Sequence, residues 1–132
     1  MKIHRSFQTS HDCEAVLTLS KDPNFLLRKL FPPVSSIEKR GNKFKAEGSY
    51  MHLSMTAEGV VLVSSNAVTY MLKTGDSVGK IELECSDRKI ELDFEYEGCD
   101  GFLAKRILSN WFDRFVEDFE ENVRLMRIER RV

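Results

Sequence analysis

Three histidines and three cysteines are the residues of this chain best suited to nucleophilic, acid–base or metal chemistry, and they are widely spaced. None of His4, His11 and His52 has a second ligand at the spacing with which a helix or hairpin holds a metal ion. Cys13 lies near the expected start of a helix, where the thiol pKa is lowered, but no histidine accompanies it at a fixed local spacing. We therefore find no catalytic motif and predict no metal site and no cofactor.

His52 is the histidine that one strand register directs into the interior. It is in phase with Phe44 and Tyr50, whereas Met51 and Leu53 support the opposite register, so a bulge near Tyr50 would decide its direction. The favoured interpretation is a hydrogen-bonded core or rim histidine. The alternative is an enzyme of the cyclase or thioester-processing kind, in which His52 and Tyr50 would form the acid–base pair.

The cysteines and the hydropathy pattern predict a cytoplasmic location. Cys13, Cys85 and Cys99 have no close pairing in the sequence, and an odd number leaves one unpaired, which suggests a reducing compartment. The longest uninterrupted apolar run is Val60 to Val63, too short to span a membrane. The first residues alternate like a strand and lack the apolar segment of a signal peptide.

Charge is unevenly distributed although the net charge is only −1. Residues 1–45 contain nine Lys and Arg against four Asp and Glu, and residues 46–132 contain eleven against seventeen. One interpretation is an ordinary mixed-sign surface. The other is a basic rim that attracts an anionic ligand group. No dense basic patch with interleaved aromatic residues occurs, so nucleic-acid binding is not expected.

The periodicity of apolar residues predicts an α+β order. Residues 2–9 alternate as a strand, Ser10 is the expected cap of a short helix, and Asp22 with Pro23 starts a second helix over residues 24–30. Pro32 and Pro33 end that helix. Six further strands follow, with turn residues between them, over residues 34–40, 43–55, 58–65, 67–73, 78–85 and 89–96. Such short connections predict a meander of antiparallel strands.

A single long helix is predicted over residues 101–130. Apolar residues recur at three- and four-residue spacing from Ala104 to Met126 and form one wide stripe. A helix of about 30 residues is roughly 45 Å long, so it must lie along the sheet rather than cap one end. We expect residues 1–132 to form one domain in which a curved sheet wraps around this helix.

This order of elements resembles the START-type helix-grip superfamily, also called SRPBCC. The resemblance covers the whole chain, and its local part is LSKDPNFLLRKLFPPV at residues 19–34, where Lys21 interrupts the leucine–serine–aspartate–proline run common in the superfamily. The exit Phe31-Pro32-Pro33 resembles a small branch of it. The resemblance implies a seven-stranded curved antiparallel sheet, two short helices after the first strand, and a cavity between the sheet and the last helix.

The expected ligand is a hydrophobic small molecule such as a lipid, a fatty-acyl derivative or a polycyclic compound. The resemblance favours a cavity beside the first half of the last helix, with these lining residues: Phe25, Leu30, Phe31, Phe44, Tyr50, His52, Tyr70, Leu83, Phe94, Tyr96, Ala104, Ile107, Leu108, Trp111 and Phe112. An anionic head group would meet cations at the mouth, namely Arg28, Lys29, Lys43 and Lys45. Besides the enzyme, a protein-interaction module with a filled core stays an alternative.

Overall fold

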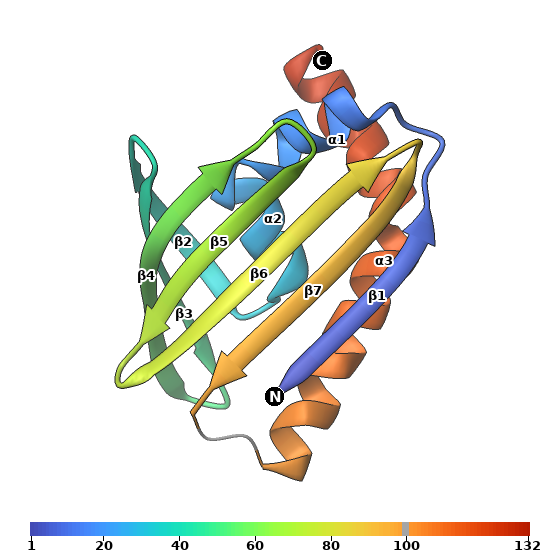
Figure 1. Ribbon diagram of the computed structural model, residues 1–132. Helices are drawn as coiled ribbons and strands as arrows, with labels where there is room; N and C mark the ends of the chain where they lie inside the picture. Colours follow the sequence, from blue (N-terminus) through green and yellow to red (C-terminus); the bar gives the residue numbers. More distant parts are fainter. Residues whose placement is uncertain (99–100) are drawn as a thin grey trace.

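The computed structural model describes residues 1–98 and 101–132. Within these residues, three helices and seven strands follow one another in the order that the sequence predicts. They are β1 (Lys2–Gln8), α1 (Cys13–Ser20), α2 (Pro23–Leu30), β2 (Val34–Arg40), β3 (Lys43–Tyr50), β4 (Leu53–Val63), β5 (Ala67–Thr74), β6 (Ser77–Ser86), β7 (Lys89–Glu97) and α3 (Phe102–Arg130). Figure 1 shows the strands side by side with α3 running along them.

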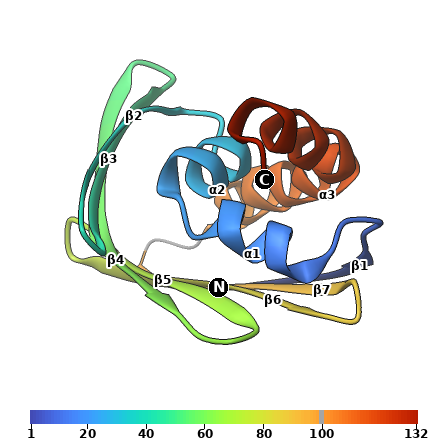
Figure 2. The ribbon, with the colours of Figure 1, turned by 90° about the horizontal axis from the view of Figure 1, so that it is seen from above.

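All seven strands form one antiparallel sheet in the order β1-β7-β6-β5-β4-β3-β2. Each strand pairs with its sequence neighbour except β1, which joins the free edge of β7. The sheet curves strongly, so that β2, β3 and β4 form one wall and the remaining strands another (Figure 2). All three helices lie inside this curve. The predicted helix-grip fold, a seven-stranded curved sheet holding a long C-terminal helix, is therefore confirmed.

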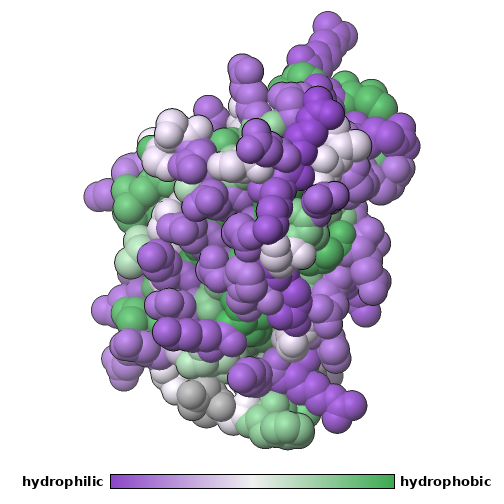
Figure 3. Space-filling view, turned by 45° about the vertical axis from the view of Figure 1, so that its right-hand side comes forward, coloured by the Kyte–Doolittle hydropathy of each residue, from purple (hydrophilic) through white to green (hydrophobic). Residues whose placement is uncertain are grey.

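Polar contacts from β1 fix α3 across the sheet. The Arg5 guanidinium donates hydrogen bonds to the Asp113 carboxylate at 2.7 Å and to the Ser109 hydroxyl at 2.7 Å. Hydrophilic side chains cover most of the face that includes this helix (Figure 3). Such an arrangement is typical of a helix that buries one stripe and exposes the other.

The start of α1 differs from the sequence prediction. Asp12, not Ser10, is the N-cap, and its carboxylate accepts a hydrogen bond from the Ala15 amide at 3.0 Å. Ser10 instead donates from its hydroxyl and its amide to Glu120 on α3. Thr9 also donates its hydroxyl to the Glu120 carboxylate. Thr9 and Ser10 therefore hydrogen-bond to the long helix α3, and Ser10 does not cap α1.

The turn between β3 and β4 also differs from the prediction. It lies at Met51 and His52, which have the left-handed φ angles 51° and 69°. The sequence pattern predicts one strand through residues 43–55 and a turn at Glu58–Gly59. Gly59 is instead inside β4, where an added Cβ would lie 1.9 Å from the Met71 carbonyl oxygen. Glycine is therefore needed there for close approach of two strands and not for a turn.

The interior is filled beside α3 from Phe112 onward. Phe112, Phe115, Phe119 and Val123 are at most 2% exposed and pack with the apolar faces of β5, β6, β7, α1 and α2. Tyr70 is fully buried in the same cluster and donates its hydroxyl to the Ser20 carbonyl at 2.7 Å. Burial, together with the negative charge of Asp22, raises the pKa of this hydroxyl. This part of the interior is closely packed.

A disulfide joins Cys13, the first residue of α1, to Cys85 on β6. The expectation that these cysteines have no close partner was wrong. Their Cα atoms are 5.5 Å apart although 72 positions separate them in the sequence, and that distance is typical of a disulfide. Long-range folding of α1 onto the sheet brings them together, which spacing in the sequence does not reveal. Cys99, the third cysteine, lies outside the described residues.

Candidate functional site

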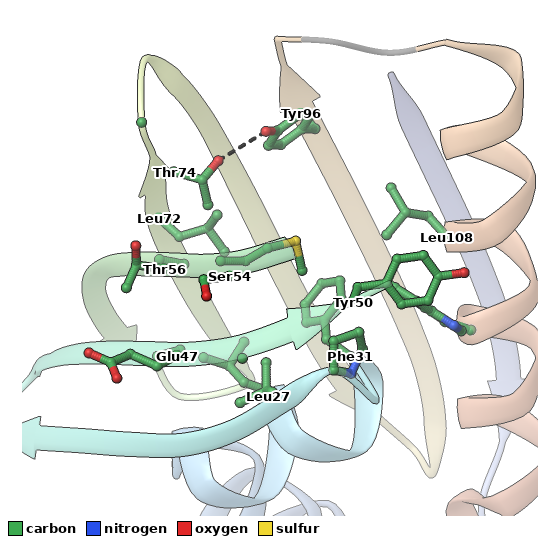
Figure 4. A pocket seen from close by; sticks show the side chains of 18 of the residues that line it. Leu27, Phe31, Glu47, Tyr50, Ser54, Thr56, Leu72, Thr74, Tyr96 and Leu108 are labelled. Carbon is green, nitrogen blue, oxygen red and sulfur yellow. Dashed lines mark hydrogen bonds between the residues drawn. The ribbon is translucent and has the colours of Figure 1, made fainter. Parts of the chain in front are cut away.

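A cavity of about 580 Å³ lies between the curved sheet, the end of α2 and the first half of α3. Figure 4 shows its side chains converging from the sheet, the α2 exit and α3. The cavity walls are mainly apolar and aromatic. Lining residues are Leu27, Phe31, Pro33, Val34, Phe44, Ala46, Glu47, Gly48, Tyr50, Ser54, Met55, Thr56, Ala57, Leu72, Thr74, Gly75, Phe94, Tyr96, Ala104, Ile107, Leu108 and Trp111.

The structure brings most of the predicted lining residues together. From that predicted set the residues at the cavity are Phe31, Phe44, Tyr50, Phe94, Tyr96, Ala104, Ile107, Leu108 and Trp111. Five others lie in the packed core, where each is fully buried, and do not line the cavity: Phe25, Leu30, Tyr70, Leu83 and Phe112. The sheet covers the long helix along its length, with the packed core beside one part of the helix and the cavity beside the other. An inward-facing residue can therefore lie in either region.

His52 does not enter the cavity, contrary to the prediction. It is exposed at the β3–β4 turn, and its φ of 69° reverses the chain at that point. Tyr50 precedes the turn and does line the cavity, where its ring packs edge-on against Trp111 with centroids 5.6 Å apart. The turn therefore separates the two side chains that an acid–base pair would need.

The four cations predicted at the mouth are all exposed and do not line the cavity. Lys43 and Lys45 alternate with the buried Phe44 along β3, so the pleat directs them to the outer face. Lys45 lies 3.6 Å from the Glu47 carboxylate, also on that face. Arg28 and Lys29 occupy the exposed side of the last turn of α2. The basic balance of the first third of the chain is therefore surface charge outside the cavity lining.

An aromatic wall separates the cavity from the packed core. The Phe31 ring lies edge-on to Phe94, Trp111 and Phe112, with centroid distances of 6.1, 6.4 and 6.1 Å. Phe94 in turn stacks on Tyr96 at 6.0 Å with nearly parallel planes. Edge-to-face and offset aromatic pairs of this kind hold the rings in defined orientations. The wall therefore presents aromatic rings in defined orientations to the cavity.

Close backbone approach shapes the opposite wall. A Cβ atom at Gly48 would lie 2.1 Å from the Pro33 carbonyl oxygen, so β3 and the start of β2 come closer there than any side chain allows. The sequence prediction did not include the first part of β4 or the entry to β2 among the lining segments. Ser54, Met55, Thr56 and Ala57 become recognisable as lining residues only once the turn is placed at Met51–His52.

Two hydroxyl groups form the polar end of the cavity. The Thr74 Oγ1 and Tyr96 OH atoms are 2.9 Å apart and hydrogen-bonded (Figure 4). Thr74 ends β5 and Tyr96 is near the end of β7, with β6 between them. The described lining residues include no histidine, cysteine, lysine or arginine, and Glu47 is their one carboxylate.

The described residues contain neither a cluster of metal-ligating side chains nor a helix that could cross a membrane. No group of three or more His, Cys, Asp and Glu side chains within residues 1–98 and 101–132 is placed to hold a metal ion. No helix in the same ranges combines the length and apolar character that a membrane crossing requires. The cavity is therefore the candidate site.

The fold and the cavity define a helix-grip protein, similar in architecture to the major latex-like proteins. A family model matches residues 1–132, the whole chain, and the chain belongs to that family. No curated protein matches the sequence.

Solved structures show the same architecture over nearly the whole chain. A hypothetical protein from Sulfolobus tokodaii is 27% identical, with a TM-score of 0.83 over 98% of this chain and 99% of that one. A protein from Thermus thermophilus is 16% identical, with a TM-score of 0.68 over 96% and 99% of the two chains. Major latex-like protein 151 from Panax ginseng is 10% identical, with a TM-score of 0.63 over 92% and 95%. The similarities to the Thermus thermophilus and Panax ginseng proteins show a shared fold only.

Proposed function

We propose that this protein binds a hydrophobic small molecule in the cavity between the sheet and α3. The observation that carries the proposal is a space of about 580 Å³ lined mainly by apolar and aromatic side chains. Pockets for small molecules typically have this size and composition. Burying about 300 Å² of apolar ligand surface would contribute roughly 7.5 kcal/mol at ~25 cal/mol per Å², before the entropic costs of association.

The two alternatives from the sequence have less support. An interaction module would have a filled interior beneath Trp111, whereas Trp111 lines an open cavity. An enzyme would need an acid–base or nucleophilic group at the ligand, and the described lining offers hydroxyl groups and the Glu47 carboxylate for that role. His52, the residue on which the enzyme alternative depended, is exposed at a turn.

A cavity-filling variant tests the proposal. Ala104 lines the cavity from the first turns of α3, and Ala104→Phe would occupy ligand space. Asn110→Phe introduces the same side chain at an exposed position of the same helix and is the matched control. The neutral apolar dye N-phenyl-1-naphthylamine should bind wild type with enhanced emission and with quenching of Trp111, the only tryptophan.

We expect Ala104→Phe to weaken dye binding at least tenfold and Asn110→Phe to leave it within twofold. Equal binding by wild type and both variants would contradict the cavity as the binding site. Native mass spectrometry of protein purified from its own host would then identify any co-purified ligand and its mass.

The cytoplasmic location stays a prediction. It was inferred from cysteines without partners, and the Cys13–Cys85 disulfide removes that premise. Disulfides persist mainly in oxidising compartments and in the intracellular proteins of hyperthermophiles. Alkylation of acid-quenched cells, followed by mass analysis of the chain, measures the state of these two cysteines where the protein resides. A fully reduced pair would support a reducing compartment.

A further inference from the structure

The polar atoms of the cavity restrict which ligand it can hold, an inference that rests on the proposed function. No described lining side chain is cationic, and the polar ones are Glu47, the Trp111 indole N–H and the hydroxyls of Tyr50, Ser54, Thr56, Thr74 and Tyr96. Glu47 is exposed and interacts with Lys45 at 3.6 Å, and Figure 4 shows its side chain directed away from Tyr50 and Leu108. Any polar recognition inside the cavity therefore depends on neutral groups.

The Thr74–Tyr96 pair is held in place by the strands beneath it. Gly79 on β6 pairs with Leu72 of β5 on one side and with Tyr96 of β7 on the other. A Cβ atom at Gly79 would lie 3.2 Å from the Tyr96 ring and 3.1 Å from the Leu72 side chain. Because glycine leaves this space open, the Tyr96 ring can lie across β6. Its hydroxyl then reaches Thr74, with 2.9 Å between the Tyr96 OH and Thr74 Oγ1 atoms.

Stacking on Phe94 also restricts the Tyr96 ring. Phe94 lies on Tyr96 with centroids 6.0 Å apart and an interplanar angle of 19°. The tyrosine hydroxyl is thus oriented before any ligand arrives, which lowers the entropic cost of forming a hydrogen bond to that ligand.

The hydrogen-bond capacity of the pair defines the partner. Each hydroxyl has one O–H donor and two acceptor lone pairs. One donor is used between Thr74 and Tyr96, so one O–H and several lone pairs remain for a ligand. Such a pair suits a hydroxyl, which donates and accepts, or a carbonyl, which accepts.

A carboxylate or phosphate group fits this site poorly. Burying an anion without a cationic partner carries a large desolvation cost. Arg28, Lys29, Lys43 and Lys45 lie outside the lining, and Glu47 directs its carboxylate to the outer face beside Lys45. No described lining side chain therefore supplies a positive charge for a buried anion. We infer that the cavity selects an uncharged, flat, mainly apolar molecule whose single hydroxyl or carbonyl group hydrogen-bonds to the Thr74–Tyr96 pair while its body packs on the aromatic wall.

Three matched probes separate this inference from the proposed function: fluorene, 9-fluorenol and fluorene-9-carboxylate, measured by equilibrium dialysis at pH 7.5. Tyr96→Phe and Thr74→Val remove one hydroxyl each with nearly unchanged shape. Thr69→Val is the control, since Thr69 is on the same strand but its hydroxyl contacts Glu82 instead of the cavity. Thermal melts followed by circular dichroism confirm that each variant is folded.

We expect wild type to bind 9-fluorenol at least tenfold more tightly than the carboxylate. Tyr96→Phe and Thr74→Val should each weaken 9-fluorenol about fivefold, as loss of one neutral hydrogen bond predicts. Fluorene should stay within twofold in both variants, and Thr69→Val should change no affinity.

Equal binding of 9-fluorenol and the carboxylate would overturn the inference. The same holds for equal losses of fluorene and 9-fluorenol in Tyr96→Phe, because the residue would then act through cavity shape. In either case fluorene binding that Ala104→Phe abolishes would leave the proposed function standing. Failure of wild type to bind any of the three probes would contradict both.

Discussion

The covalent link between α1 and β6 supports a quantitative prediction about stability. Cys13 and Cys85 are 72 positions apart, so the disulfide closes a long loop in the unfolded chain. The chain-entropy relation for a loop of that length gives a stabilisation of about 4 kcal/mol at 25 °C. We expect the double variant Cys13→Ala, Cys85→Ala to lose about this free energy of unfolding, since alanine keeps both Cβ atoms in place.

Guanidinium unfolding followed by circular dichroism measures the loss. Oxidised wild type, reduced wild type and the double variant are compared by free energy as well as by midpoint, because a cross-linked unfolded chain is more compact and lowers the slope m. With m of about 4 kcal/mol per M, the midpoint should fall by roughly 1 M. Reduction should shift wild type and leave the double variant unchanged, which is the internal control.

Two results would refute this reasoning. One is a difference of less than about 0.5 kcal/mol between the free energies of unfolding of oxidised wild type and the double variant. Loop closure predicts a difference of about 4 kcal/mol. The other is alkylation of both Cys13 and Cys85 in denaturant without reductant, which would show that the pair is not bonded.

Two further predictions concern the packed half of the molecule. Phe112 is fully buried, so Phe112→Ala should destabilise the fold by about 3–5 kcal/mol, and a loss below about 1 kcal/mol in urea unfolding would contradict its place in the core. Burial raises the pKa of Glu120, but hydrogen bonds from Ser10 and Thr9 outweigh it and hold that pKa below its usual value. The resulting stabilisation is present above about pH 4.5 and is lost as pH falls through the lowered pKa. Glu120→Gln should therefore be less stable than wild type at pH 7, with a smaller difference at pH 3, and a difference that does not shrink would contradict the assignment.

The architecture was predictable because, along most of the chain, turn-forming residues occur where the spacing of apolar residues changes or ends. Gly41 and Gly75 have the positive φ angles expected of turn glycines, and Asp22 and Pro23 begin α2 as expected. The β3–β4 turn was not predictable, since Met51 and His52 are neither glycine nor asparagine and adopt left-handed φ angles without a local signal. That displaced turn changes which residues of β4 face inward.

The sequence predicts the type of site, an apolar cavity, better than it predicts which residues line it. Alternation identifies an inward face but not whether that face meets packed side chains or open space, which is why Phe44 lines the cavity while the equally inward Tyr70 is in the core. The Cys13–Cys85 pairing depends on how α1 docks on β6. The Thr74–Tyr96 bond spans an intervening strand through the space that Gly79 leaves. Tertiary contacts of this kind carry no signature in local sequence.

The long helix borders a packed core along one part of its length and the cavity along the other. From Phe112 onward its buried residues are three phenylalanines and Val123, which fill the space under the sheet, and the nearby α1 is bonded to β6 through the disulfide. Before that position Ala104, Ile107, Leu108 and Trp111 face the cavity. A bound apolar molecule would complete the interior at this end, so it should stabilise the first turns of α3 more than the last ones. Binding of the proposed ligand should therefore raise the stability of the folded protein.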